Sequence, residues 1–342
     1  MNFKNLQDDF SVRYNTKTKP YCTFSGTPLF LLGDISFSDC GHSLISAISA
    51  GTALSISFEG TDFSIQQTHD NTVFSSEKKN LLTYSEKNYA TPIFHAISYL
   101  NSHFKNDSEG LMLLYEHNTN SKGFYNYLSP LISAFLLLFP GYTLTDALTA
   151  LSSLNLSKKE YFSLLTTLSQ SKGHITLADN LSLLTKNYLL PLDDSKIVII
   201  KTDSKPKKIF TDFSPVADPD ELSKEQRRIL SFFIKEEERI LKYPEIKDFS
   251  EFHNLINESC EDLLPLIDTP AISLLIDIIR KTPALSSRPI ANSSSVFTIV
   301  PDSEIDSFIG FAEKEYEKKA GYKPTFYITD TVASGIKSGL IH

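Results

Sequence analysis

The chain has 342 residues, a formal net charge of -8, a pI near 5.5 and 41% hydrophobic residues. This length predicts one large or two medium domains, and the hydrophobic fraction supplies an ordinary buried core. The lysines of this acidic chain are scattered, which argues against duplex nucleic acid and anionic membranes as partners. We interpret the densest basic run, residues 205–208, as a solvated loop.

Cysteine usage and the N-terminus indicate a cytoplasmic protein. Cys22, Cys40 and Cys260 stand far apart without CxxC spacing, so neither a disulfide framework nor a zinc site is expected. The opening MNFKNLQDDF is too polar for a signal peptide, and the longest apolar run, 131–139, is too short to cross a membrane.

The first half of the chain alternates strand and helix patterns. Short stretches rich in β-branched and aromatic residues predict strands at 21–26, 53–59, 63–68, 110–117 and 173–180. Helical periodicity predicts helices at 90–104, 129–139, 146–154 and 157–171. We read Ser129 as the N-cap and Pro130 as the first position of the second of these helices.

A break near 189–196 divides the chain, so we predict domains at 1–192 and 193–342. A strand at 196–203 and a polar linker at 214–223 precede three helices at 224–242, 249–267 and 271–281. The tail predicts a strand at 295–301, a helix that Asp302 or Ser303 begins and Gly321 ends, and a strand at 325–330. This pattern indicates a split βαβ module and, for the whole chain, the α+β class.

The order of elements and three sequence landmarks resemble the galactokinase family of the GHMP small-molecule kinases. FSGTPLFLLGDISFSDCGHSLISAISAGT resembles the family's A-P-G-R-V-N-L-I-G-E-H-x-D-Y-x-x-G segment, which a helix follows. SKGHITLADNLSL is similar to the segment after the catalytic aspartate, and FTIVPDSEIDSFIGFAEKEYEKKAGYKPTFYITD to the closing strand-helix-strand. The resemblance covers the chain from about Phe10 onward. It implies a ribosomal-S5-like first domain, a ferredoxin-like second domain, and ATP and sugar held between them.

Phosphoryl transfer requires a cation near the γ-phosphate and polar groups that grip the sugar. In the resemblance, the arginine of G-R-V-N falls on Pro28, which carries no charge. The E-H-x-D tetrad falls on residues 34–37, where Asp34 keeps a carboxylate and Phe37 replaces the aspartate. We favour a turn role for Asp34 over hydroxyl binding, and surface-loop roles for Asp39 and His42.

The implied phosphate loop is also altered. The family's P-x-G-x-G-L-S-S-S-A-A falls on NSKGFYNYLSP, residues 120–130, where Phe124, Tyr125 and Tyr127 place bulk at the point of phosphate approach. The serine that would serve Mg²⁺ becomes Tyr127 or Leu128. Asn126 is a candidate ligand contact, although we favour a loop-structural role for it.

The remaining motifs are lost as well. The catalytic aspartate falls on Ser163, which cannot accept a proton at neutral pH. The nearest acid is Glu160, which we favour as a solvated helix residue over a relocated base. The glycine motif before the last core strand reads SSRPIANSSSVF, in which Arg288 could pair with an anion but is more typical of a surface loop.

The sequence contains no motif for other chemistry. The eight histidines lack the HExxH spacing of a metal site, and neither the GxSxG elbow nor the GxGxxG fingerprint occurs. We therefore expect a galactokinase-like protein without kinase chemistry, cofactor or catalytic residues, which binds a small metabolite or engages a protein partner. The candidate ligand contacts are Asp34, Asp39, His42, Asn126 and Arg288. The alternative is an active sugar or metabolite kinase that uses ATP and Mg²⁺ and a rearranged site built from Asp34, Glu160 and Arg288.

Overall fold

The computed structural model describes residues 3–34, 41–117, 125–205, 222–267 and 269–331. With those gaps, residues 3–28 and 47–171 form one compact unit, and residues 29–46 and 172–331 form a second. The described residues of 29–46 and residues 172–192 therefore belong to the second unit. The domain boundary that we expected between residues 192 and 193 stays a prediction.

The first unit is built on five strands: β1 (Tyr21–Leu32), β2 (His42–Ser57), β3 (Phe63–Gln67), β4 (Phe74–Ser76) and β5 (Leu111–His117). β3 runs parallel to β5 and antiparallel to β4. β2 is antiparallel to β5, with Thr52 opposite His117 and Ser57 opposite Met112. β2 belongs to both units, because its residues up to Ser46 are assigned to the second.

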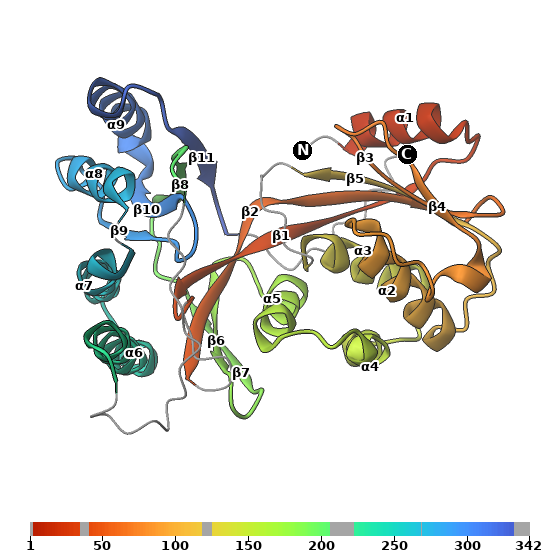
Figure 1. Cartoon of the computed structure of the whole chain (residues 1–342), viewed down its shortest axis with the longest axis horizontal. Helices are drawn as coiled ribbons and strands as arrows, with labels where there is room; N and C mark the ends of the chain where they lie inside the picture. Colours follow the sequence, from red (N-terminus) through yellow and green to blue (C-terminus); the bar gives the residue numbers. More distant parts are fainter. Residues whose placement is uncertain (1–2, 35–40, 118–124, 206–221, 268, 332–342) are drawn as a thin grey trace. The chain divides into compact units, whose positions relative to one another are not determined.

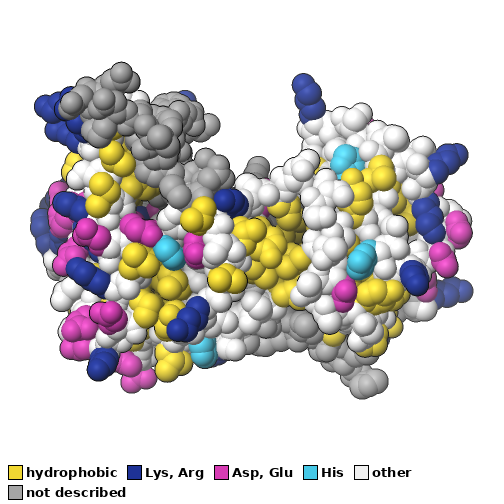
Figure 2. All heavy atoms as spheres, turned by 90° about the horizontal axis from the view of Figure 1, so that it is seen from below, with side chains coloured by type: hydrophobic (Ala, Val, Ile, Leu, Met, Phe, Trp, Pro, Cys, Tyr) yellow, Lys and Arg dark blue, Asp and Glu magenta, His cyan; other side chains and the backbone are white. Residues whose placement is uncertain are grey.

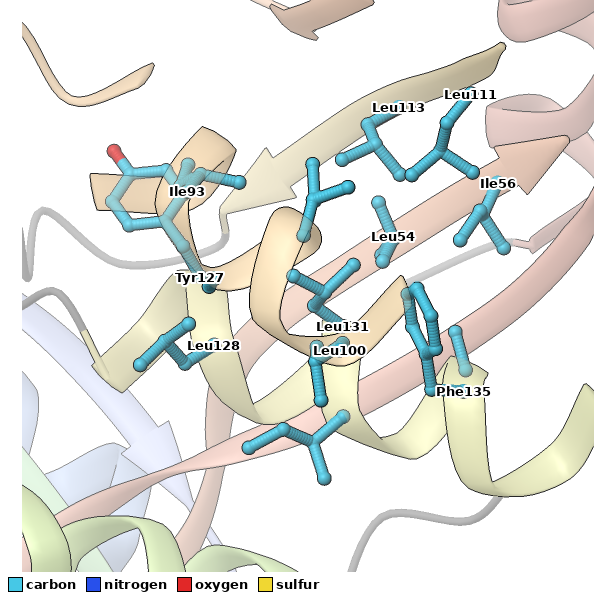
Figure 3. Packing of buried hydrophobic residues seen from close by; sticks show 14 of the residues in the cluster. Leu54, Ile56, Ile93, Leu100, Leu111, Leu113, Tyr127, Leu128, Leu131 and Phe135 are labelled. Carbon is cyan, nitrogen blue, oxygen red and sulfur yellow. The ribbon is translucent and has the colours of Figure 1, made fainter. Parts of the chain in front are cut away.

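Successive side chains of each strand point to opposite faces of the sheet, and helices cover both faces. The first unit therefore has three layers (Figure 1). Ala53 and Leu114 face Leu6 and Phe10 of α1 (Phe3–Tyr14) on one side of the sheet. The opposite face packs against α2 (Ala90–His103), α3 (Tyr125–Leu138), α4 (Leu144–Ala150) and α5 (Lys158–Ser169). Figure 3 shows Leu128, Leu131 and Phe135 of α3 in this larger core.

Two local expectations are corrected in this unit. The resemblance implied a helix after Gly41, but residues 42–57 form β2, which is buried on both faces and therefore lacks the alternation that marks a half-exposed strand. Helix α3 begins at Tyr125, so Ser129 is an interior residue and not its N-cap. Pro130 likewise lies inside the helix, where its missing N–H removes one backbone hydrogen bond.

The second unit contains an antiparallel sheet in the order β11 (Thr325–Thr329), β8 (Ser195–Lys201), β10 (Ser295–Pro301), β9 (Ser286–Pro289). β10 and β11 both pair with β8, so the strands that flank α9 (Ile305–Ala320) are separated by one strand, which confirms the split βαβ module. Gly321 ends α9 in the left-handed conformation at φ 81°, as predicted.

Helices and a hairpin complete this unit. α8 (Pro270–Ile279) and α9 pack on one face of the sheet, and α6 (Lys224–Lys242) packs against α7 (Phe249–Ile267). α6 and α7 have the bounds that the periodicity predicts. β6 (His174–Asp179) and β7 (Thr185–Leu189) form the hairpin. The mixed elements of both units confirm the α+β class.

The exposed charges are dispersed on the face that Figure 2 displays, where Lys and Arg side chains are interspersed with Asp and Glu. Within the described ranges, no helix is both long and apolar enough to span a bilayer.

Candidate functional site

Arg288 is the centre of the most elaborate polar cluster in the second unit. It lies on β9 with 0% of its surface exposed. Nη2 donates to Asp34 Oδ1 (2.6 Å) and Glu236 Oε1 (3.1 Å), Nε donates to Ser259 Oγ (2.7 Å), and Nη1 donates to the carbonyl of Pro289 (3.1 Å). The interpretation of Arg288 as a surface-loop residue was wrong, because its pairing on β9 opposite Phe297 places it inside the unit.

Asp34 neutralises this cation from the end of β1. Its Oδ2 accepts a hydrogen bond from the backbone N–H of Ala291 (2.6 Å), and the residue is 6% exposed. Asp34 is therefore a buried ion-pair partner of Arg288, while the turn role that we favoured depends on residues 35–40, which lie outside the described residues. Burial alone would lower the pKa of Arg288, but the charges of Asp34 and Glu236 outweigh it and raise that pKa.

The cluster continues onto two helices. Glu236 of α6 accepts from the backbone N–H of Gly33 (3.1 Å) and from Arg239 (3.3 Å), which also pairs with Asp262 of α7. Gly33 has φ 74°, and a Cβ there would lie 2.5 Å from the carbonyl oxygen of His42, so only glycine fits. This cluster fastens β1 and β9 to α6 and α7.

His42 begins β2 and touches α6. Its backbone N–H donates to Glu237 Oε2 (2.8 Å), and its Nδ1 lies 2.5 Å from Oε1 of the same carboxylate. The side chain is partly buried by this contact, so His42 is a strand residue with a helix partner and not a free surface-loop histidine. Asp39 lies outside the described residues, as do Ile35, Ser36 and Phe37.

In the first unit, the start of α3 is packed with aromatic rings. Tyr127 stacks on Tyr89 with ring centroids 5.4 Å apart, and its ring meets those of Tyr115 and His117 edge-on. Its hydroxyl accepts from Gln67 Nε2 (2.8 Å). Burial lowers the pKa of His117 to about 4, so this imidazole is neutral at pH 7. Figure 3 labels Tyr127 together with Ile93 of α2 among the residues of this buried cluster.

The other implied positions on α3 and α5 are also buried. Asn126 is 3% exposed in the first turn of α3, inside a helix and not in the loop that we favoured. Ser129 Oγ lies 2.7 Å from Thr167 Oγ1 of α5. Residues 120–124 of the implied phosphate loop lie outside the described residues.

The positions implied for the catalytic cation and carboxylate carry no charge. Pro28 is buried within β1. Ser163 lies on α5 with 0% exposure, and its hydroxyl has no partner in the described part of the chain. Glu160 accepts from the backbone N–H of Ser157 (2.9 Å) in a capping box at the start of α5, in agreement with its reading as a solvated helix residue.

Some of these residues belong to the first unit and others to the second. Asp34 and Arg288 come together, joined by Glu236, a residue that sequence reasoning missed. The sequence contained a sign of its burial. At helical spacing Glu236 follows Ile229, Phe232 and Phe233 on the apolar face of α6. Within the described ranges, no three His, Cys, Asp or Glu side chains are placed to hold a metal ion. The expectation that the chain uses no cofactor, with ATP and Mg²⁺ only under the alternative of an active kinase, stays a prediction.

Comparison with solved structures identifies the fold. The chain is similar to Lactococcus lactis galactokinase complexed with galactose, with a TM-score of 0.72 and 13% identity over 98% of this chain and 99% of that one. Methanococcus jannaschii mevalonate kinase gives a TM-score of 0.69 and 11% identity, covering 93% and 100%. Thermoplasma acidophilum mevalonate-3-kinase, with mevalonate 3-phosphate and ADP bound, gives 0.57 and 11%, covering 92% and 97%.

No family model matches the sequence, and no curated protein matches it significantly. At this low identity the structural likeness establishes the fold. The chain therefore has the two-domain α+β fold of the GHMP kinases, as the resemblance implied.

Proposed function

We propose that this chain, which has the fold of the GHMP small-molecule kinases, is a galactokinase-like protein that does not phosphorylate sugar. It serves instead as a noncatalytic protein that binds a small metabolite or a protein partner. The observation that carries the proposal is Ser163, which stands where the resemblance implies the catalytic aspartate and is an uncharged side chain with no exposed surface.

Two further observations support the same conclusion. The first turn of α3, where the resemblance implies a serine for Mg²⁺, carries Tyr127, whose ring and hydroxyl are engaged by Tyr89 and Gln67. Arg288 is fully buried, and its Nε, Nη1 and Nη2 atoms all donate to protein acceptors, so the described structure does not present it to a transferring phosphoryl group.

The competing function is an active ATP-dependent sugar or metabolite kinase. The observation in its favour is the close approach of Asp34 and Arg288, a carboxylate and a cation of the types that phosphoryl transfer uses. Their mutual neutralisation weakens this alternative, and so does the capping role of Glu160, its third residue.

A thermal-shift titration tests the proposal. Mg-ATP, ADP, galactose and a panel of other sugars are added singly and in pairs, with an active galactokinase as the positive control. A ligand at about 100 times its Kd stabilises a protein by roughly 2.7 kcal/mol, which gives a clear shift. We expect no shift with the combination of Mg-ATP and sugar beyond the shifts with each alone.

The outcomes separate the possible roles. A shift with one sugar alone identifies a metabolite-binding protein, and no shift with any ligand directs the search to protein partners. A cooperative shift with Mg-ATP and one sugar, followed by formation of the sugar phosphate, contradicts the proposal.

A further inference from the structure

Strand β7 forms the outer edge of the β6–β7 hairpin in the second unit (Figure 1). β6 pairs with the start of β2 on one side and with β7 on the other, whereas among the described residues no strand pairs with the other side of β7. Natural proteins protect such an edge against further pairing with prolines, bulges or charged side chains. β7 has no proline, it pairs with β6 without a bulge, and its one charged residue is Lys186. The edge is therefore open to pairing with another strand.

Leucine side chains are exposed on the same hairpin. Leu181, Leu184 and Leu189 expose 74%, 69% and 74% of their surfaces. Residues 181–189 contain more exposed large hydrophobic side chains than any other stretch of equal length in the described ranges. A single exposed leucine is ordinary, but a cluster of them is typical of an interaction site. The hairpin thus offers apolar contacts beside unpaired backbone groups.

The hydrogen bonds at the two ends of β7 show which of its backbone groups point outward. The N–H of Asp179 donates to the carbonyl of Leu184 (2.9 Å), and the N–H of Leu190 donates to the carbonyl of Gly173 (2.8 Å). Backbone groups alternate in direction along an antiparallel strand, so every second residue from Leu184 to Leu190 points to β6 and the residues between them point away from it. The outward-pointing residues are Thr185, Asn187 and Leu189.

These outward groups match those of a second copy of the chain. When two β7 strands run antiparallel about a twofold axis at Asn187, this residue faces its own copy and Thr185 faces Leu189. All of the facing residues point their backbone groups at one another, so they form hydrogen-bonded pairs. The carbonyl of Leu189 accepts from the hydroxyl of Tyr243 (2.6 Å) and keeps a second lone pair for this contact. The edge is therefore complementary to itself.

Charge favours the same arrangement. The register about Asn187 places Lys186 opposite Tyr188 of the second copy, whereas a parallel pair in register would set Lys186 against itself, which is destabilising. Within one chain Lys186 Nζ lies 5.1 Å from the centroid of the Tyr188 ring, and the ring of the second copy offers the same cation–π attraction. Residues 180–192 contain no acidic residue, so the negative charge of the chain does not meet itself at this contact.

We propose that the β7 edge is the interface of a homodimer, in which two β7 strands pair antiparallel about Asn187. Leu184 and Tyr188 share one face of the strand, so Leu184 of each copy packs near Tyr188 of the other. Leu189 is covered on the opposite face by Thr185 of the second copy. The contact is small, so we expect a reversible dimer of micromolar affinity.

Analytical ultracentrifugation of the purified full chain tests the proposal. From roughly 1 to 300 µM, a range that covers micromolar affinity, we expect the average mass to rise from that of the monomer toward that of the dimer. Leu189→Glu should weaken association by at least about tenfold, the equivalent of 1.4 kcal/mol. The matched control Leu82→Glu places the same charge at another exposed leucine and should leave association unchanged. Both leucines are exposed, so both variants should fold, which a thermal melt verifies.

Cysteine cross-linking locates the twofold axis. Facing Cα atoms of a hydrogen-bonded antiparallel pair lie about 5.5 Å apart, within the roughly 4.4–6.8 Å that a disulfide spans. Asn187→Cys should therefore form a covalent dimer under mild oxidation. Thr185→Cys is the control, because its two copies would lie roughly 13 Å apart and should not be joined. Both variants also carry Cys40→Ser, whereas Cys22 and Cys260 are buried and can stay.

Three results would overturn the proposal. The first is a chain that stays monomeric at the highest concentration, and the second is association that Leu189→Glu and Leu82→Glu weaken equally. The third is cross-linking of Thr185→Cys as fast as that of Asn187→Cys, which would show a different register or a non-specific encounter. None of these measurements involves nucleotide or sugar, so this proposal and the proposed function fail independently.

Discussion

Arg288 shows how one residue fixes the local structure of the second unit. It ties Asp34 at the end of β1, Glu236 on α6 and Ser259 on α7 to β9. A buried ion pair adds little net stability over a well-packed apolar replacement, but removal of one partner leaves uncompensated buried charge. Here the buried carboxylates of Asp34 and Glu236 would lose the cation that they share, and Arg239 would remain beside Glu236 alone.

We therefore expect Arg288→Met to lower the free energy of unfolding by about 3–5 kcal/mol. The control is Arg280→Met, which removes the half-exposed pair with Glu261 and should cost less than about 1 kcal/mol. Urea unfolding of the three proteins measures both values. Equal effects of the two variants would show that the Arg288 cluster is not the fastening that its geometry indicates.

Contacts between individual residues were also the least predictable feature from the sequence. Arg288 and Asp34 lie 254 positions apart, and no local pattern predicts that they meet. The sequence alone showed that Pro28 and Ser163, the positions that the resemblance implies for the catalytic cation and carboxylate, carry no charge. Their burial, and the engagement of Tyr127 by three other rings, required the packing of the first unit.

At the scale of elements, amphipathic helices were the most predictable part of the chain. α6 and α7 have the predicted bounds because their apolar stripes and flanking loops agree, and the split βαβ module followed from the same logic. α3 was misjudged at its start. The aromatic residues of its first turn occur in loops as well as in helices, so they did not indicate a helix. The Ser-Pro pair at 129–130 has the sequence typical of a helix N-terminus, although it lies inside α3.

Helix α5 provides a test of the role of Glu160. If that residue is a cap partner, Ser157→Ala should lower the free energy of unfolding by about 1 kcal/mol, because the cap loses its acceptor for a backbone N–H. Glu160→Gln keeps an acceptor for the N–H of Ser157 and should cost less than about 0.5 kcal/mol.

Chemical denaturation gives both differences, and Ser152→Ala, an exposed serine outside any capping box, is the control. A loss from Glu160→Gln that exceeds the loss from Ser157→Ala would mean that Glu160 has a further charged partner, as the rearranged-site alternative requires.

The whole chain has the fold of the GHMP kinases, but uncharged residues stand where the resemblance implies the catalytic cation and carboxylate. Structural similarity to galactokinase and mevalonate kinase extends over more than nine-tenths of the chain, although only 11–13% of the residues are identical. Cores tolerate extensive substitution if pattern and volume persist, whereas phosphoryl transfer depends on individual charged groups. This difference makes the proposed absence of kinase chemistry compatible with the fold of a GHMP kinase.

The most direct test is a phosphotransfer assay of the purified chain with Mg-ATP and a panel of sugars, with formation of sugar phosphate followed by phosphorus NMR. An active galactokinase under the same conditions is the reference. The account predicts no sugar phosphate above the enzyme-free background with any sugar. Turnover with one sugar that Asp34→Asn or Arg288→Lys abolishes, while the variant still melts cooperatively, would contradict it and establish the rearranged kinase.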